Sequence, residues 1–201
     1  MNYNFEMERQ IDNIDEGCSL LLHACCAPCS SACLERLGNY FRVTVFFYNP
    51  NISEKSEYYK RLDEIKRFIK KFKTKYEIKL IEGIYNPDDF FNISRGLELE
   101  PERGSRCYKC YNLRLEETAR IAEKHNFKYF CTTLTLSPYK NSNWINEIGK
   151  RLEEKYKSTY LYSDFKKKGG YKRSIELSKE FNLYRQDYCG CIYSKRDIKS
   201  E

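Results

Sequence analysis

Short apolar runs alternate with longer segments of helical spacing along most of the chain. Residues 19–23 are centred on three leucines, and residues 43–48 are rich in β-branched and aromatic side chains, so both are typical of buried strands. Weaker runs of the same kind occupy residues 78–81, 129–133 and 159–162. The pattern therefore predicts five short strands.

The segments between these runs show apolar residues every three or four positions, as in helices. This spacing predicts helices over residues 56–72, 111–124 and 143–156. Residues 29–37 are predicted to form another helix that ends at Gly38, since glycine is favoured just beyond a helix end. Strand and helix take turns, which predicts an α/β fold with a parallel sheet and flanking helices.

One domain accounts for the whole chain. No internal repeat, low-complexity tract or linker divides it, and 201 residues can bury one sizeable core, so residues 1–201 are predicted to form a single domain. Residues 86–104, which contain Pro87, Gly96 and Pro101, are predicted to form a long loop.

Distinctive segments follow three of the predicted strands. Residues 23–29, 48–51 and 132–141 come after the first, second and fourth strands, respectively. Ligands of open parallel sheets bind beyond the C-terminal ends of the strands. One pocket is therefore predicted to collect these segments.

Hydropathy and charge predict the cellular compartment of this domain and the class of partner that it binds. The apolar run at residues 20–22 is far shorter than the roughly 20 residues that a bilayer needs, and residues 1–15 do not resemble a secretory signal. The chain is therefore predicted to be cytoplasmic, with reduced thiols and no membrane partner. A formal net charge of +7 favours a polyanion such as RNA, although proteins that bind none also carry such surfaces.

Seven of the ten cysteines form three tight groups. The first cysteine group is Cys25, Cys26 and Cys29, the second is Cys107 and Cys110, and the third is Cys189 and Cys191. The two C-x-x-C pairs have the spacing of a four-thiolate metal site, because two intervening residues let both sulfurs face one ion or cluster. Each pair is predicted to lie at the start of a helix, where the helix dipole stabilises thiolates.

A surplus of thiols argues against a purely structural zinc site, although spacing alone does not distinguish zinc from an iron–sulfur cluster. A structural zinc site needs four ligands, and the chain offers Cys25, Cys189 and Cys191 in addition. A disulfide between Cys189 and Cys191 would be strained and redox-active. The remaining cysteines are interpreted as small buried apolar residues: Cys18, Cys33 and Cys131.

His23 precedes the first cysteine group and is interpreted as a hydrogen-bonded packing residue rather than a metal ligand. No Gly-rich phosphate loop, Ser-His-Asp set or dinucleotide fingerprint is present in the sequence. The sequence therefore gives no support for ATP, NAD or acyl-transfer chemistry.

Six motifs together resemble the epoxyqueuosine reductases of the QueH type. In chain order they are the run from Leu20 to Ser30, Tyr48-Asn49-Pro50-Asn51, Arg106-Cys107-x-x-Cys110-Tyr111, the run from Ser137 to Asn141, the run from Gly170 to Ser174, and the run from Tyr184 to Cys191. The resemblance extends over residues 20–194, and the combination of motifs is specific.

This resemblance implies a HUP-like (Rossmann-like) sheet with a cysteine-rich site at its C-terminal edge. It implies reduction of the cyclopentane epoxide of epoxyqueuosine, at the wobble position of tRNA, to the alkene of queuosine. Cobalamin is not used, and an external donor supplies the electrons. The tRNA contacts predicted on this basis are Tyr139, Lys140, Lys172, Arg173 and Arg185.

The resemblance also implies a [4Fe-4S] cluster and a redox-active dithiol. Carried over by position, the cluster ligands are Cys25, Cys26, Cys107 and Cys110, and the dithiol is Cys189 with Cys191. Family members are able to hold an additional mononuclear iron, for which Cys29 is the candidate ligand. Deoxygenation of an epoxide consumes two electrons, whereas such a cluster normally passes one at a time. The hypothesis is that the cluster and the dithiol supply the reducing equivalents, and that an iron with an open coordination position acts as a Lewis acid on the epoxide oxygen.

Two other classes of protein remain open at this point. A zinc-stabilised RNA-binding module without catalysis would contain about one zinc ion and no sulfide. A thiol–disulfide oxidoreductase that uses Cys189 and Cys191 would turn over small disulfides without tRNA.

Overall fold

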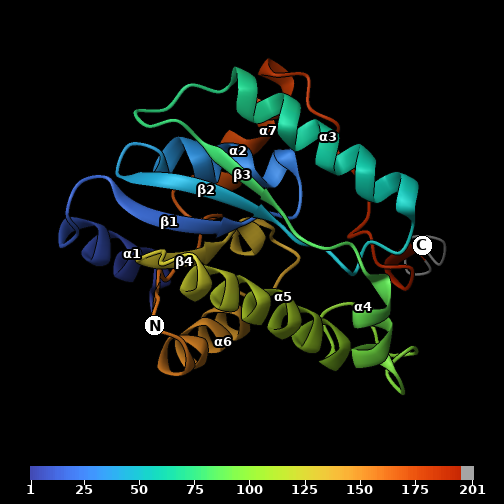
Figure 1. Cartoon of the computed structure of the whole chain (residues 1–201). Helices are drawn as coiled ribbons and strands as arrows, with labels where there is room; N and C mark the ends of the chain where they lie inside the picture. Colours follow the sequence, from blue (N-terminus) through green and yellow to red (C-terminus); the bar gives the residue numbers. More distant parts are fainter. Residues whose placement is uncertain (196–201) are drawn as a thin grey trace.

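Five parallel strands form one sheet in the order β3-β2-β1-β4-β5 (Figure 1). In this computed structural model, which describes residues 1–195, the strands are β1 (Cys18–His23), β2 (Phe41–Phe47), β3 (Lys79–Glu82), β4 (Tyr129–Thr132) and β5 (Thr159–Tyr160). Every neighbouring pair is parallel. The predicted fold class, a parallel α/β sheet with flanking helices, is confirmed.

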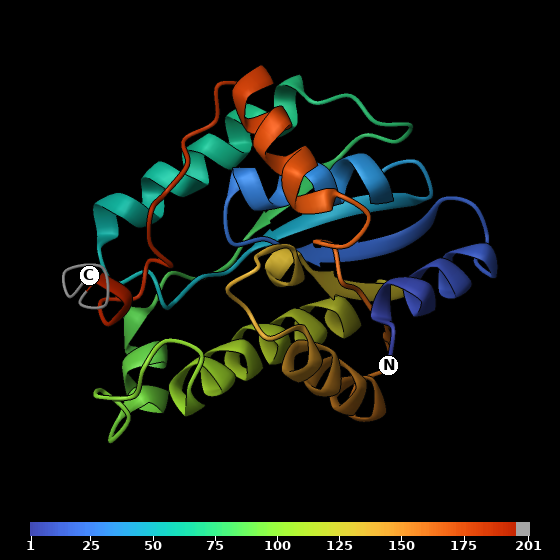
Figure 2. The ribbon, with the colours of Figure 1, turned by 180° about the vertical axis from the view of Figure 1, so that it is seen from behind.

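Helices cover both faces of the sheet (Figures 1 and 2). They are α1 (Tyr3–Asp12), α2 (Ala27–Leu37), α3 (Lys55–Lys71), α4 (Pro87–Ser94), α5 (Ser105–Lys124), the short 3-10 helix η1 (Thr133–Leu136), α6 (Ser142–Lys155) and α7 (Gly170–Glu180). Helices α2, α3 and α7 lie on one face, whereas α5 and α6 lie on the other.

Strand β1 shows why the sheet is buried on both faces. Its side chains alternate, so that Leu20 and Leu22 pack in the apolar core under α2 and α3, while Leu21 packs in the core under α5 and α6. All three leucines are fully buried. A strand that packs against helices on both faces has an almost continuous apolar sequence, and this sequence pattern predicted β1.

Four helices depart from the sequence-based prediction. The predicted loop over residues 86–104 is wrong in its first half, because Asn86 caps α4 with its side chain and Pro87 occupies the first helical turn. Helix α5 begins at Ser105, earlier than predicted, so Cys107 and Cys110 lie within its first two turns. Helices α1 and α7 were not predicted.

The carboxyl ends of the strands meet at one edge of the sheet, which the last described residues cover. Tyr193 packs with Phe90 of α4, and Lys195 forms an ion pair with Glu54 at the start of α3. Figures 1 and 2 both show this red segment between α3 and α4. Within residues 1–195, no helix combines the length and the apolar character needed to cross a membrane.

Candidate cysteine centre at the carboxyl edge of the sheet

The first cysteine group lies at the junction of β1 and α2. Cys26 is the N-cap of α2, and its Sγ accepts a hydrogen bond from the backbone N–H of Cys29 at 3.4 Å. Pro28 occupies the first turn, where a missing N–H costs nothing. The three sulfurs lie within 4.8 Å of one another, and Cys25 Sγ is 3.7 Å from Cys26 Sγ. This geometry could hold a metal ion.

Hydrogen bonding distributes charge unevenly among these three thiols. Hydrogen bonds with Cys26 and Cys29 lower the pKa of Cys25 well below its ordinary value. Burial raises the pKa of Cys26 to about 12, and the hydrogen bond with Cys25 raises that of Cys29. Among these three thiols, Cys25 therefore loses its proton most readily.

His23 anchors the strand ends behind the first cysteine group. Its Nδ1 lies 2.9 Å from Thr132 Oγ1, and its Nε2 lies 3.0 Å from the carbonyl oxygen of Tyr48. Only a protonated Nε2 can donate to that carbonyl, so Nδ1 accepts from the threonine hydroxyl. Burial lowers the pKa of His23 to about 3. The interpretation of His23 as a packing residue is confirmed, because both ring nitrogens have partners within the fold.

The second cysteine group lies on one face of α5. Cys107 is half-buried and its Sγ accepts from the backbone N–H of Arg103 at 3.3 Å, while Cys110 is buried. Burial raises the pKa of Cys107 and raises that of Cys110 to about 11. Burial of the sulfurs therefore opposes the thiolate form in this pair, against the stabilisation expected at the helix start.

The third cysteine group is held by side chains from distant parts of the chain. Arg61, on α3, donates from Nη1 to the carbonyl of Cys189 at 3.2 Å and from Nη2 to that of Tyr188 at 3.3 Å. The backbone N–H of Ser53 donates to the carbonyl of Gly190 at 3.1 Å. Arg61 is only 2% exposed and pairs with Glu57 at 2.7 Å. Cys189 and Cys191 are free thiols in this structure.

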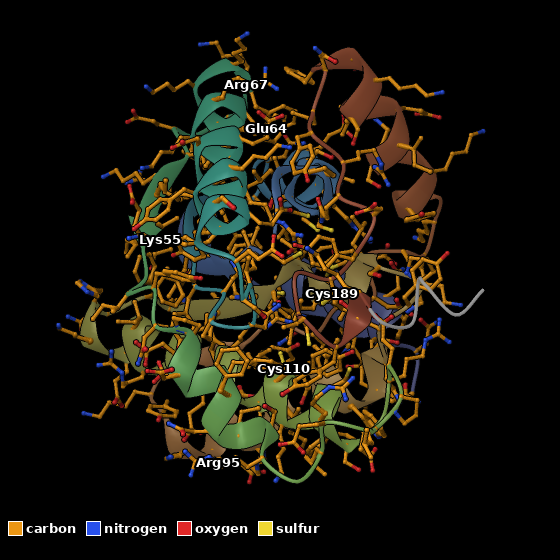
Figure 3. The ribbon with its side chains drawn as sticks, turned by 90° about the vertical axis from the view of Figure 1, so that its right-hand side faces the viewer. Lys55, Glu64, Arg67, Arg95, Cys110 and Cys189 are labelled. Atoms are coloured by element: carbon orange, nitrogen blue, oxygen red, sulfur yellow. The ribbon has the colours of Figure 1, made fainter. Side chains whose placement is uncertain are left out.

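Two adjoining cavities bring the three groups together. The larger, of about 660 Å³, is lined by Cys25, Cys29 and Cys189 among other residues. The smaller, of about 20 Å³, is lined by both residues of the second group and both of the third. Figure 3 looks onto this edge of the sheet and shows Cys110 and Cys189 between α3 and α5. Cys189 borders both cavities, and the linings include residues of the predicted segments 23–29 and 132–141 but none of residues 48–51, so the prediction of one common pocket is confirmed only in part.

The three groups are not equally ready to bind a metal. Only the first cysteine group places three ligand atoms within 4.8 Å of one another; no such set among residues 1–195 includes Cys107, Cys110, Cys189 or Cys191. Cys110 and Cys191 nevertheless pack in one apolar cluster with Phe90 and Tyr193. Of the three cysteines predicted to be buried apolar residues, Cys33 and Cys131 are buried and Cys18 is half-buried.

The predicted tRNA contacts divide into two sets. Tyr139, Lys140 and Arg185 line the larger cavity. Lys172 and Arg173 lie on α7 outside that lining, and Arg173 forms an ion pair with Glu35 at 2.7 Å. Tyr139 is 60% exposed at the mouth of the cavity, where the guanidinium of Arg103 lies 5.5 Å from its ring centre.

The sequence-based analysis missed two buried arginines in this region, Arg61 and Arg114. Both line the larger cavity. Arg114 follows Cys110 by four residues, which places the two on one helical face. This spacing could have indicated that Arg114 lies near the second cysteine group.

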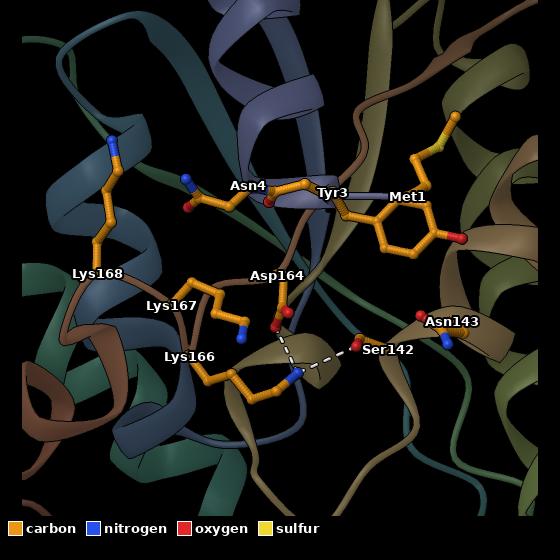
Figure 4. Close-up of a pocket in the computed structure, with 10 residues that line it drawn as sticks. Met1, Tyr3, Asn4, Ser142, Asn143, Asp164, Lys166, Lys167 and Lys168 are labelled. Atoms are coloured by element: carbon orange, nitrogen blue, oxygen red, sulfur yellow. Dashed lines mark hydrogen bonds and ion pairs between the residues drawn. The ribbon is translucent and has the colours of Figure 1, made fainter.

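A separate cavity of about 600 Å³ lies near the N-terminus and contains no cysteine (Figure 4). Lys166 there donates to Ser142 Oγ at 3.0 Å and forms an ion pair with Asp164 at 2.5 Å. Because these polar groups satisfy one another, the cavity carries no comparable chemistry.

Comparison with known proteins identifies similar chains. The family model described as epoxyqueuosine reductase QueH matches residues 20–197. The epoxyqueuosine reductase QueH of Streptococcus pyogenes serotype M1 is 44% identical over 180 residues, which are 89% of this chain and 71% of the relative. That of Haemophilus influenzae is 45% identical and covers 89% and 72%, respectively. That of Thermotoga maritima is 36% identical and covers 88% and 90%.

Proposed function

The chain belongs to the epoxyqueuosine reductase QueH family, and on this basis we propose that it reduces epoxyqueuosine in tRNA to queuosine. The observation that carries the proposal, beside the family, is the meeting of all three cysteine groups around connected cavities at the carboxyl edge of the sheet. Neither a structural zinc site nor a simple dithiol needs this many thiols in one region.

The reaction sets the requirements for the site. Both carbon–oxygen bonds of the epoxide break, a carbon–carbon double bond forms, and the oxygen leaves as water. The balance requires two electrons and two protons. The site must therefore deliver reducing equivalents and protons to one oxygen atom.

The cysteines fit an iron–sulfur cofactor in their chemistry. We propose that Cys25, Cys26, Cys107 and Cys110 hold a [4Fe-4S] cluster and that Cys29 is a ligand of an additional mononuclear iron. Three sulfurs within 4.8 Å of one another support this assignment, as does the buried guanidinium of Arg114, two of whose nitrogens have no partner within residues 1–195. When bound, such groups supply one-electron transfer and Lewis acidity.

The third cysteine group is the source of both electrons and both protons in this proposal. Oxidation of the Cys189 and Cys191 thiols to a disulfide forms one sulfur–sulfur bond and releases two electrons and two protons. An external electron donor then reduces the disulfide for the next turnover. The position of Cys189 on both cavities supports a role between the substrate and the other cysteines.

Basic and aromatic side chains at the cavity mouth support tRNA as the substrate. We propose that Tyr139 stacks on a base while Lys140 and Arg185 contact phosphate or sugar oxygens. Lys172 and Arg173 are proposed to contact more distant parts of the tRNA. Asp187 also lines the cavity, and we propose that it passes a proton to the epoxide oxygen. A tRNA substrate implies a cytoplasmic reaction.

Metal analysis without oxygen tests the proposal most directly. Iron, zinc and sulfide would be measured in the purified protein and in a Cys107→Ala, Cys110→Ala variant, followed by turnover of tRNA that contains epoxyqueuosine. We expect about four or five irons with about four sulfides, and a sharp fall in the variant. About one zinc without sulfide would instead indicate an RNA-binding module. Turnover of small disulfides without tRNA reduction would indicate a thiol–disulfide oxidoreductase.

A further inference from the structure

Arg114 is a buried cation with few partners. Its residue is 1% exposed, on the face of α5 that carries Cys110. Its Nη1 donates to Asn49 Oδ1 at 3.2 Å, whereas Nε and Nη2 have no hydrogen-bond partner among the described residues. A buried guanidinium normally has its donors paired, because desolvation of the charge is costly.

Thiols line both cavities that Arg114 borders, together with the carboxylates of Glu102 and Asp187. Buried or half-buried ion pairs join Arg61 to Glu57 and Lys166 to Asp164, but none joins Arg114 to a carboxylate within residues 1–195. Burial opposes the charged form of Arg114, yet its pKa is raised, because the sulfurs of Cys110, Cys189 and Cys25 act on it. Neutral thiols would leave the charge uncompensated, whereas metal-bound thiolates would compensate it.

A second contact links Arg114 to the first cysteine group. Asn49, which accepts from Arg114, donates from Nδ2 to the carbonyl of Ala24 at 2.9 Å. Ala24 immediately precedes Cys25, so a short chain of hydrogen bonds connects α5 with the loop after β1. Arg114 also borders both cavities.

We propose that Arg114 is the buried counter-cation of the cysteine centre and, through Asn49, positions the first cysteine group relative to Cys110. Arginine suits this role because its guanidinium stays charged and can donate to several acceptors in one plane. The inference rests on the proposed function only in requiring that the thiols bind a metal.

Metal affinity gives the first test. Chelator-stripped Arg114→Met, Arg114→Lys and wild-type proteins would be titrated with Co²⁺ and followed by thiolate-to-metal absorption. The matched control is Arg120→Gln, which removes an exposed charge from the same helix. We expect Arg114→Met to bind Co²⁺ at least about tenfold more weakly, whereas the lysine variant and the control stay close to wild type.

Thermal unfolding separates charge compensation from packing. In the stripped protein, Arg114→Met removes an uncompensated charge, so its melting temperature should equal or exceed that of the stripped wild type. In the metal-loaded protein the same change should lower it. An equal fall in both states would assign Arg114 to packing alone and overturn the inference.

The reduction potential of the reconstituted centre gives a third test, because a change in packing alone would not shift this potential. Loss of a nearby positive charge disfavours the reduced, more negative form. We expect Arg114→Met to lower the equilibrium constant for reduction about tenfold, which for one electron corresponds to a shift of about 59 mV toward negative potential. Arg114→Lys should keep the wild-type potential, and a shift in that variant as large as in Arg114→Met would overturn the inference.

The outcomes also separate this inference from the proposed function. If the wild-type protein binds no Co²⁺ and holds no iron, the proposed metal centre fails. If the wild type binds metal and Arg114→Met binds it equally well at an unchanged potential, only the role of Arg114 fails. Should Arg114→Met not fold, loss of Co²⁺ binding in the charge-preserving lysine variant would still refute charge compensation.

Discussion

The first and third cysteine groups reach the same cavity by different means. In the first, the end of β1 and the first turn of α2 set the sulfur positions, and Thr133 Oγ1 accepts from the backbone N–H of Cys25 at 3.4 Å. In the third, Arg61 and Ser53 hold the loop from more than a hundred residues away in sequence. The comparison teaches that the first group is built mainly on one strand–helix junction, whereas the third is a loop whose position depends on residues that carry no redox chemistry.

The largest effect is expected from Cys26→Ala. This change removes both the N-cap sulfur of α2 and one of the three clustered sulfurs. We expect iron content to fall below about a tenth of wild type and turnover to fall at least about a hundredfold. Cys33→Ala is the control, since Cys33 is buried on the same helix but outside the group. Retention of iron by Cys26→Ala would remove the first group from the metal site.

A double change, Cys189→Ser with Cys191→Ser, should act on turnover without acting on metal content. The thiols line the cavities, but the first cysteine group does not depend on them for its geometry. We expect iron content near wild type and multiple-turnover activity reduced at least about thirtyfold. Full multiple-turnover activity with unchanged iron would exclude an essential dithiol.

Arg61→Lys tests whether distant support of the third group matters. Lysine can keep the ion pair with Glu57 but cannot donate to two carbonyls in one plane. We expect activity to fall about tenfold with metal content retained. Arg67→Lys is the matched control, because Arg67 lies on the same helix and bonds to carbonyls near the end of α7 instead. Equal losses in both variants would mean that α3 packing, and not the third group, is affected.

Gly190→Ala should give the smallest effect. Gly190 has φ of +98°, and an added Cβ would lie 2.8 Å from Ile52 Cγ1, so both backbone strain and crowding oppose alanine. We expect a loss of about 1–3 kcal/mol in the free energy of unfolding, measured with denaturant. Gly96→Ala has φ of +74° and open space around it, so it isolates the strain. A cost equal to that of Gly96→Ala would mean that Ile52 moves aside.

Much of the fold could be predicted because its signals are local. The continuous apolar run of β1 follows from burial on both faces, and the helical spacing of α3 and α6 follows from burial on one. The start of α5 was misplaced because its first turns hold cysteines and polar residues in place of a periodic apolar pattern. The sequence pattern predicts a loop where α4 lies, although Asn86 and Pro87 are favourable residues for the start of a helix.

The candidate site was less predictable, for two physical reasons. The cysteine groups are visible in the sequence, but which groups meet depends on the order of strands in the sheet. Arg61 and Arg114 lie on amphipathic helices, where a charged residue normally faces solvent, and only the packing of the cavity walls buries them. The pKa of Cys110 in the second group also depends on burial, and burial cannot be inferred from the spacing of residues in the sequence.

The place of the third group in the chain bears on how the centre is assembled during synthesis. Residues of β1, α2 and α5 leave the ribosome well before Cys189, which lies 160 positions after Cys29. Domains fold as units while synthesis proceeds from the N-terminus. The wall that Cys189 and Cys191 contribute to the smaller cavity is therefore added after α5 has been synthesised, and until then the second group lacks its cover on that side.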